Sequence, residues 1–275
     1  MLENLAQTGR LRVLALGQRA ADALAQSTGN LQPIPGFEQT PYRLAGEEIV
    51  WVGTHGQSHP RAVFVQSAPN GETLEWNAHL TPLALTHTHA GLNADAVRRN
   101  FLGFARRCTE LGEPRGLGRL LAGSLPPFPL DLRADSARRL AAAAGNGDIA
   151  DFVASAMRLL GVGGGLTPSG DDFVGAALFT LYHLHPGAAH WESAAGILRA
   201  AVRTRSHVIS AALFADLSEG ASFASLHELL DAAGASAEAM LEPARRLTAI
   251  GHSSGWDMFA GMVAAATGTL QHITL

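Results

Sequence analysis

The sequence predicts an α+β protein with a β-rich portion over residues 1–90 and a larger α-helical portion over residues 91–275. Short strand-like runs separated by turn residues fill the first portion. After Gly91 the chain changes to alanine- and leucine-rich segments punctuated by glycine and proline, a composition that favours helices. At 275 residues, length alone allows one large domain or two smaller ones, and the change in composition favours two.

The first portion alternates apolar runs with turns. Strands are predicted at 12–17, within 42–53, at 62–68 and at 72–78, with one helix near 18–26. Ala45-Gly46 supplies a turn inside the second of these runs. Asn70-Gly71 is a strong signal for a short hairpin loop between the last two runs.

The second portion is a succession of predicted helices with one proline-rich break, GSLPPFPLD at 123–131. The helices are expected at 93–108, 116–122, 131–144, 148–160, 171–185, 189–204, 206–218, 222–232, 237–250 and 256–271.

Charge and composition exclude several function classes. The formal net charge of −4 provides no basic surface field for nucleic acid or an anionic membrane. The longest apolar runs, 173–184 and 258–270, are shorter than the roughly 20 residues that span a bilayer. Glu3 and Arg10 interrupt the start, which therefore lacks the apolar segment of a signal peptide. The single cysteine, Cys108, allows no intrachain disulfide, which fits a reducing cytoplasm. From these observations together we expect a cytoplasmic protein with no nucleic-acid or membrane partner.

The segment GVGGGLTPSGDD, residues 161–172, opens one of the apolar helices and has a partial echo later in the chain. Ser169 and Asp172 have the spacing of a capping box, in which each side chain satisfies a free backbone N–H at the helix start. Ser254 and Asp257 repeat the pattern S-G-x-D. Helix capping alone would account for these four residues.

Capping leaves the surplus glycine and Asp171 unexplained. Glycine lets backbone N–H groups close around an anion at a helix N-terminus, where the helix dipole favours negative charge. No Lys-Ser or Lys-Thr follows the loop and no strand precedes it, which excludes a Walker motif and a dinucleotide fingerprint. The segment is therefore a candidate anion site as well as a helix start.

The two S-G-x-D helices are predicted to pack side by side. Both are apolar nearly all round, and each has a glycine one turn in, Gly175 and Gly261, where a neighbouring backbone could approach. Their N-termini would then meet at one pocket, with positions 169 and 254 about 10 Å apart. The residues expected to converge there are Thr167, Ser169, Asp171, Asp172, His252, Ser253, Ser254 and Asp257.

Such a cluster offers two kinds of chemistry. Carboxylates can act as general bases or hold Mg²⁺, for which Asp171 and Asp172 are the candidates, while amides and hydroxyls hold phosphate or carboxylate. In RTRSHVIS, residues 203–210, two arginines offer planar donors and three residues add hydroxyls: Arg203 and Arg205, and Thr204, Ser206 and Ser210. The alternative for this third segment is an ordinary helix junction with solvated arginines.

Histidines raise a separate metal hypothesis. His87 and His89 share one face if extended, and His183 with His185 repeats the H-x-H spacing. Neither pair has a convincing third ligand nearby in the sequence, so surface or core histidines are the simpler interpretation.

GVGGGLTPSGDDFVGAAL resembles the signature G-x-G-x-G-L-T-P-S-G-D-D-x-x-x-G of the AllH-subunit family of oxamate carbamoyltransferase, a bacterial family long classed as a domain of unknown function. RTRSHVIS is similar to its threonine-containing segment and IGHSSGWDMFAGM to its G-H-S-S-G-x-D motif, whereas the first ninety residues match only in general character. The resemblance implies a subunit of an enzyme of anaerobic allantoin degradation. That enzyme transfers a carbamoyl group between oxalurate and phosphate, gives oxamate and carbamoyl phosphate, and needs two other subunits.

On that resemblance, the glycine amides with Thr167 and Ser169 would cradle a dianion, Arg203 or His252 would donate to an oxyanion, and an aspartate would position the amide nitrogen or a metal. The catalytic candidates are Asp171, Asp172, His252 and Asp257, and the ligand-binding candidates are Gly163, Gly164, Gly165, Thr167, Ser169, Gly170, Arg203, Thr204, Ser210, Ser253 and Ser254. Two alternatives remain. One is an ATP- and Mg²⁺-dependent phosphotransferase or another small-molecule enzyme. The other is a non-catalytic scaffold subunit whose glycines serve close packing and whose apolar surface binds partners.

Overall fold

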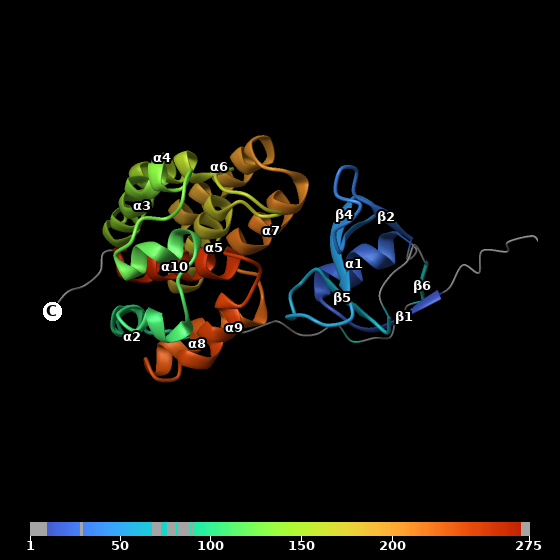
Figure 1. Ribbon diagram of the computed structural model, residues 1–275, viewed down its shortest axis with the longest axis horizontal. Coiled ribbons are helices and arrows are strands. Elements are labelled where there is room, and N and C mark those ends of the chain that lie inside the picture. Colours follow the sequence, from blue (N-terminus) through green and yellow to red (C-terminus); the bar gives the residue numbers. More distant parts are fainter. Residues whose placement is uncertain are drawn as a thin grey trace, which may run out of the picture. The chain divides into compact units, whose positions relative to one another are not determined.

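The protein has a strand-rich unit and a helical unit, so the predicted α+β class is confirmed (Figure 1). The computed structural model describes residues 10–27, 30–67, 73–75, 81, 89 and 91–270. The chain divides into two compact units, residues 1–87 and residues 88–275. No helix in the described ranges is long and apolar enough to cross a membrane.

The first unit is one mixed sheet with a single helix. Its elements are β1 (Arg10–Leu16), α1 (Gln18–Ser27), β2 (Leu31–Pro33), β3 (Tyr42–Ala45), β4 (Glu48–Gly53), β5 (Ala62–Val65) and β6 (Thr73–Glu75), and the strand order is β2-β3-β4-β5-β1-β6. Leu24 of α1 packs with Leu16, Val50 and Val63 of the sheet to form this unit's own core. β3 and β4 form the predicted hairpin, and Gly46 in its turn has the positive φ of 65° that glycine adopts without strain.

The second predicted hairpin is wrong. β1 lies between β5 and β6 in the sheet, and β6 pairs with β1 in parallel. The two runs flanking Asn70-Gly71 are therefore not neighbours; these two residues themselves fall outside the described ranges. Asn-Gly favours a tight turn locally, but a third strand inserted between the two runs decides the pairing. β2 had no counterpart among the predicted strands.

The second unit is built from helices close to those predicted. They are α2 (Ala94–Ala105), η1 (Cys108–Leu111), η2 (Gly116–Ala122), η3 (Asp131–Arg133), α3 (Ala134–Asn146), α4 (Ile149–Leu159), α5 (Ser169–Leu184), α6 (Ala189–Arg205), α7 (Val208–Ser218), α8 (Ala224–Ala235), α9 (Leu241–Thr248) and α10 (Ser254–Thr267), where η marks a 3₁₀ helix. The proline-rich stretch at 123–131 separates η2 from η3, as predicted.

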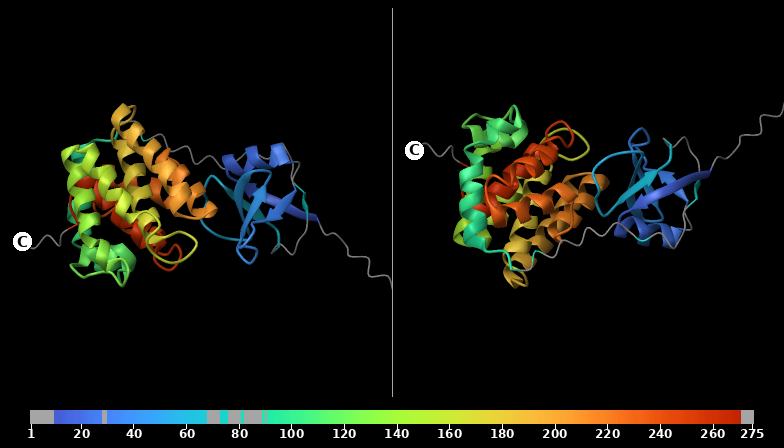
Figure 2. Two further views of the ribbon diagram at one scale, coloured as in Figure 1. Left: turned by 90° about the horizontal axis from the view of Figure 1, so that it is seen from above. Right: turned by 90° about the horizontal axis from the view of Figure 1, so that it is seen from below.

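α5 and α10 are the central pair of this unit, and Figure 2 shows α10, in red, surrounded by other helices. Gly261 of α10 faces the carbonyl oxygen of Phe173 so closely that a Cβ atom would collide with it. Glycine therefore permits the backbone approach predicted for this position. Gly175 instead faces the side chains of Phe214 and Leu217 on α7, so the backbone approach predicted for it is wrong and its glycine makes room for these side chains.

Candidate functional site

The starts of α5 and α10 lie side by side, as the sequence predicted. The hydroxyl of Thr167 is 3.0 Å from that of Ser254, and the hydroxyl of Ser169 is 3.4 Å from that of Ser253. Residues more than eighty positions apart thus share one hydroxyl layer between the two helix starts. We call these four residues, Thr167, Ser169, Ser253 and Ser254, the hydroxyl layer.

The capping-box interpretation is wrong for both helices. Pro168 is the N-cap of α5 and Ser169 is its first helical residue, while Ser253 is the N-cap of α10. Neither N-cap makes a side-chain capping bond. The serine hydroxyls contact the opposite helix start, because the close packing of α5 on α10 offers them partners that an isolated helix lacks.

The glycine in each S-G-x-D echo has a packing reason. A Cβ atom on Gly170 would collide with the carbonyl oxygen of Leu159 at the end of α4, and one on Gly255 would collide with that of Leu247 in α9. In both cases the helix start lies directly against the end region of the preceding helix. The repeated S-G-x-D pattern therefore marks two similar helix–helix corners at which only glycine fits. The ligand-binding role predicted for Gly170 stays a prediction.

The glycine-rich loop has a packed part and an open part. Gly163 has a φ of 119°, and a Cβ atom there would lie 2.6 Å from the backbone nitrogen of Ser169. Gly164 and Gly165 are exposed, and a Cβ atom on either would meet nothing closer than 3.9 Å. Within the described residues, neither amide donates to another backbone group. The close packing found at Gly163 is therefore absent at Gly164 and Gly165, and this part of the loop is open.

Asp171 is buried and accepts three hydrogen bonds. Its Oδ1 accepts from the Gly161 amide at 2.7 Å, and its Oδ2 accepts from the hydroxyls of Ser210, at 2.6 Å, and Ser206. Both oxygens are therefore engaged in joining the loop before α5 to the junction between α6 and α7. Ser210 reaches this cluster by donating to Asp171, and the ligand-binding role predicted for it stays a prediction.

Asp172 and Asp257 form a buried acidic pair behind the hydroxyl layer. Desolvation, and next the nearby Asp257, raise the pKa of Asp172 well above its ordinary value, although Thr167 donates to Oδ2 at 2.8 Å. Burial raises the pKa of Asp257 to about 7. Carboxyl groups shifted in this way hold a proton near neutral pH, as general acids and bases do.

Among the described residues, only one of the two carboxylate oxygens of Asp257 accepts a hydrogen bond. Its Oδ1 accepts the backbone N–H of Leu117 at 2.6 Å, at the start of η2, and a Cβ atom on Gly116 would collide with this carboxyl group. Its Oδ2 is buried without a hydrogen-bond partner in the described part of the chain. The Ser169 and Ser253 hydroxyls lie close enough to lower the pKa of Asp257, but their geometry falls short of hydrogen bonds to Oδ2.

Gly116 and Leu117 are site residues that the sequence prediction missed. Leu117 lies 140 positions from Asp257, and G-L-G-R-L carries no catalytic pattern. Ser206 was one of the three hydroxyls noted in RTRSHVIS but was not among the ligand-binding candidates, and its hydroxyl donates to Asp171.

Three candidates lie at the margin of this cluster. Arg203 and Thr204 are exposed at the end of α6, and the Thr204 hydroxyl donates to the Ala201 carbonyl of its own helix. His252 is exposed, and its carbonyl oxygen accepts from Arg115. The functional roles predicted for these side chains stay predictions.

The chain was compared with known families, with curated proteins and with solved structures. Residues 159–266 match the model of the family described as oxamate carbamoyltransferase subunit AllH. The resemblance predicted from the motifs is thereby confirmed for this segment. No curated protein and no solved structure matches the chain.

The AllH-matched segment contains most of the cluster but not all of it. It runs from the end of α4 to the last turn of α10 and includes the glycine-rich loop, the hydroxyl layer and all three aspartates. The Leu117 amide that holds Asp257 lies outside the segment. The acidic pair therefore depends on a part of the helical unit that the family match does not cover.

The raised pKa values of Asp172 and Asp257 predict a contribution of these two groups to stability that is larger at pH 5 than at pH 8. A carboxyl group whose pKa is raised by folding keeps its proton in the folded chain while the unfolded chain loses it, so stability falls as pH rises from about 4 to 7. For Asp257 the full change is about 4 kcal/mol, of which about 2.7 kcal/mol falls between pH 5 and pH 8. Urea unfolding of wild type and Asp257→Asn at both pH values measures this contribution, because the variant lacks it while the opposite contribution of the buried His59 is common to both. An Asp257→Asn variant that keeps the wild-type pH dependence would contradict the prediction.

Proposed function

We propose that this chain is a subunit of an oxamate carbamoyltransferase-type enzyme and that the cluster between the starts of α5 and α10 is its substrate site. The family match supplies the enzyme class. The observation that carries the site assignment is Asp257 Oδ2, a fully buried carboxylate oxygen without a hydrogen-bond partner among the described residues, next to an open glycine loop. Buried polar atoms without a hydrogen-bond partner are uncommon in folded proteins, and a catalytic role is one of the established reasons for them.

The open loop and the hydroxyl layer suit an anion. Gly164 and Gly165 are exposed, and Thr167, Ser253 and Ser254 are half-buried, so the loop and part of the hydroxyl layer face outward. All lie at the N-terminal ends of two helices, where the dipoles favour negative charge. We therefore assign phosphate or the phosphate group of carbamoyl phosphate to this outer layer.

The acidic pair suits the proton transfer that the reaction requires. In the phosphorolytic direction a phosphate oxygen attacks the carbamoyl carbon of oxalurate, the C–N bond breaks, and the leaving oxamate nitrogen takes up a proton as phosphate gives one up. Asp172 and Asp257, with raised pKa values, hold and return such a proton near neutral pH. In this proposal Asp171 positions the loop rather than the proton. The other subunits of the complex are its partners.

Ligand-induced stabilisation tests this assignment. Phosphate and carbamoyl phosphate at 100 times Kd should each stabilise the chain by about 2.7 kcal/mol, which thermal unfolding resolves readily. Thr167→Val removes one hydroxyl of the layer and should abolish this gain. The matched control is Thr248→Val, since the Thr248 hydroxyl donates to carbonyl oxygens of its own helix and is not among the candidate residues.

The same experiment separates the alternatives. Stabilisation by ATP with Mg²⁺ but not by phosphate would favour the phosphotransferase. No stabilisation by any of these anions, together with no effect of Thr167→Val on activity of the assembled enzyme, would favour the scaffold subunit.

A further inference from the structure

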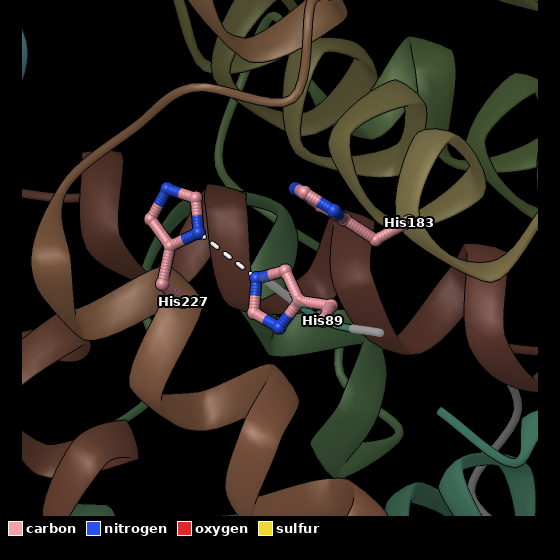
Figure 3. Close-up of side chains that lie close together, drawn as sticks. All are labelled: His89, His183 and His227. Atoms are coloured by element: carbon pink, nitrogen blue, oxygen red, sulfur yellow. Dashed lines mark hydrogen bonds between the residues drawn. The ribbon is translucent and has the colours of Figure 1, made fainter. Parts of the chain in front are cut away.

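Three histidines from distant parts of the helical unit meet away from the cluster described above. They are His89, which precedes α2, His183 in the last turn of α5, and His227 on α8 (Figure 3). One ring nitrogen of each lies within 4.8 Å of those of the other two. Each predicted H-x-H pair thus contributes one member, and the third ligand that the sequence did not show is His227. His87, the partner of His89, falls outside the described ranges.

The His89 and His227 rings are oriented toward one another. His89 Nε2 lies 3.0 Å from His227 Nδ1, as the dashed line in Figure 3 marks, and His89 Nδ1 lies 2.6 Å from Asp231 Oδ1. A carboxylate on one imidazole nitrogen fixes the ring and its tautomer, which directs the lone pair of the other nitrogen toward the group. Carboxylate, imidazole and metal in this order recur at zinc sites.

His183 is also fixed by a second contact. Its Nε2 lies 2.9 Å from the carbonyl oxygen of Gly220. With Nε2 donating to that oxygen, the lone pair is on Nδ1, so the backbone sets the tautomer of this ring as Asp231 does for His89. The side chains of His89 and His227 are 2% exposed, which shields the group from bulk water.

We propose that His89, His183 and His227 bind a divalent transition-metal ion of the Zn²⁺ class, with Asp231 positioning His89. Imidazole suits Zn²⁺, and three histidines with one open position is an established zinc geometry. Zn–N bonds of about 2.0–2.1 Å place tetrahedral nitrogens roughly 3.3–3.4 Å apart. The 3.0 Å pair needs to open by a few tenths of an ångström, and the third ring to move inward.

The proposed metal site is separate from the proposed substrate site. His183 follows Ser169 by fourteen residues on one helix, which corresponds to about 21 Å along α5. A metal ion there would tie the segment that leads into α2 to both α5 and α8. The inference therefore stands or falls independently of the carbamoyl-transfer proposal.

Metal titration of the full chain tests the site directly. After chelation, Co²⁺ should bind at one equivalent with the visible absorption of a four-coordinate Co²⁺ ion, and Zn²⁺ should displace it. Zn²⁺ at 100 times Kd should raise Tm by about 5–10 °C. His227→Ala should abolish both effects. His185→Ala is the matched control, because this exposed histidine of the same H-x-H pair is outside the group.

Asp231→Asn is a second test variant, which keeps the proposal testable if the histidine variants do not fold. Its side chain is 44% exposed, and its removal should weaken Co²⁺ binding by about 10–100-fold while the circular dichroism spectrum is unchanged. Failure of the wild-type chain to bind Co²⁺ and Zn²⁺ would overturn the proposal, as would wild-type binding by folded His227→Ala.

Discussion

Asp171→Asn is expected to lower the free energy of unfolding by about 3–5 kcal/mol. The buried carboxylate accepts from one backbone amide and two serine hydroxyls, and hydrogen bonds to a charged acceptor contribute about 1.5–3 kcal/mol each. Asparagine keeps one acceptor oxygen and turns an N–H₂ group toward donors, so at least one oxygen's contacts are lost. Urea unfolding at pH 8 measures the change.

Asp172→Asn is the matched control for this prediction. The two aspartates are adjacent and equally buried, but the raised pKa of Asp172 shows that its surroundings favour the neutral form. An amide of the same shape should therefore change stability by less than about 1 kcal/mol, or increase it at pH 8. Equal losses in both variants would mean that Asp171 has no special part in joining the loop to the α6–α7 junction.

The different surroundings of Asp171 and Asp172 could not be predicted from the sequence. Both are acidic residues at a helix start and both were catalytic candidates; the capping box accounted for Asp172 and left Asp171 unexplained. Tertiary contacts distinguish them, because Ser206 and Ser210 approach Asp171 while Asp257 approaches Asp172. Local spacing carries no information about which of these distant groups arrives.

Helix positions were more predictable than the contacts between helices. Glycine, proline and the apolar periodicity mark α3 to α10 closely, since these signals act within a few residues. The meeting of the α5 and α10 starts could also be predicted, because two helices apolar all round must both be buried. The Leu117 amide, His227 and the insertion of β1 between β5 and β6 depend on long-range packing that no short pattern encodes.

Asp257→Asn is expected to lower kcat for carbamoyl transfer by about 10²–10⁴-fold in the assembled enzyme, the range for loss of a general acid or base. The prediction rests on the proposed function. Asparagine cannot exchange a proton near pH 7, yet its oxygen can still accept from the Leu117 amide. Formation of carbamoyl phosphate from oxalurate and phosphate is the measurement, with Asp257→Glu testing partial recovery.

Stability and activity should change in opposite directions in this variant. Replacing an ionisable buried carboxyl by an amide removes the cost of holding charge there, so Asp257→Asn should be at least as stable as wild type at pH 8. A structural residue would lose stability and activity together, whereas a catalytic group kept in an unfavourable environment loses activity alone. An active, stabilised Asp257→Asn would remove the acidic pair from the mechanism and leave the hydroxyl layer as a binding surface only.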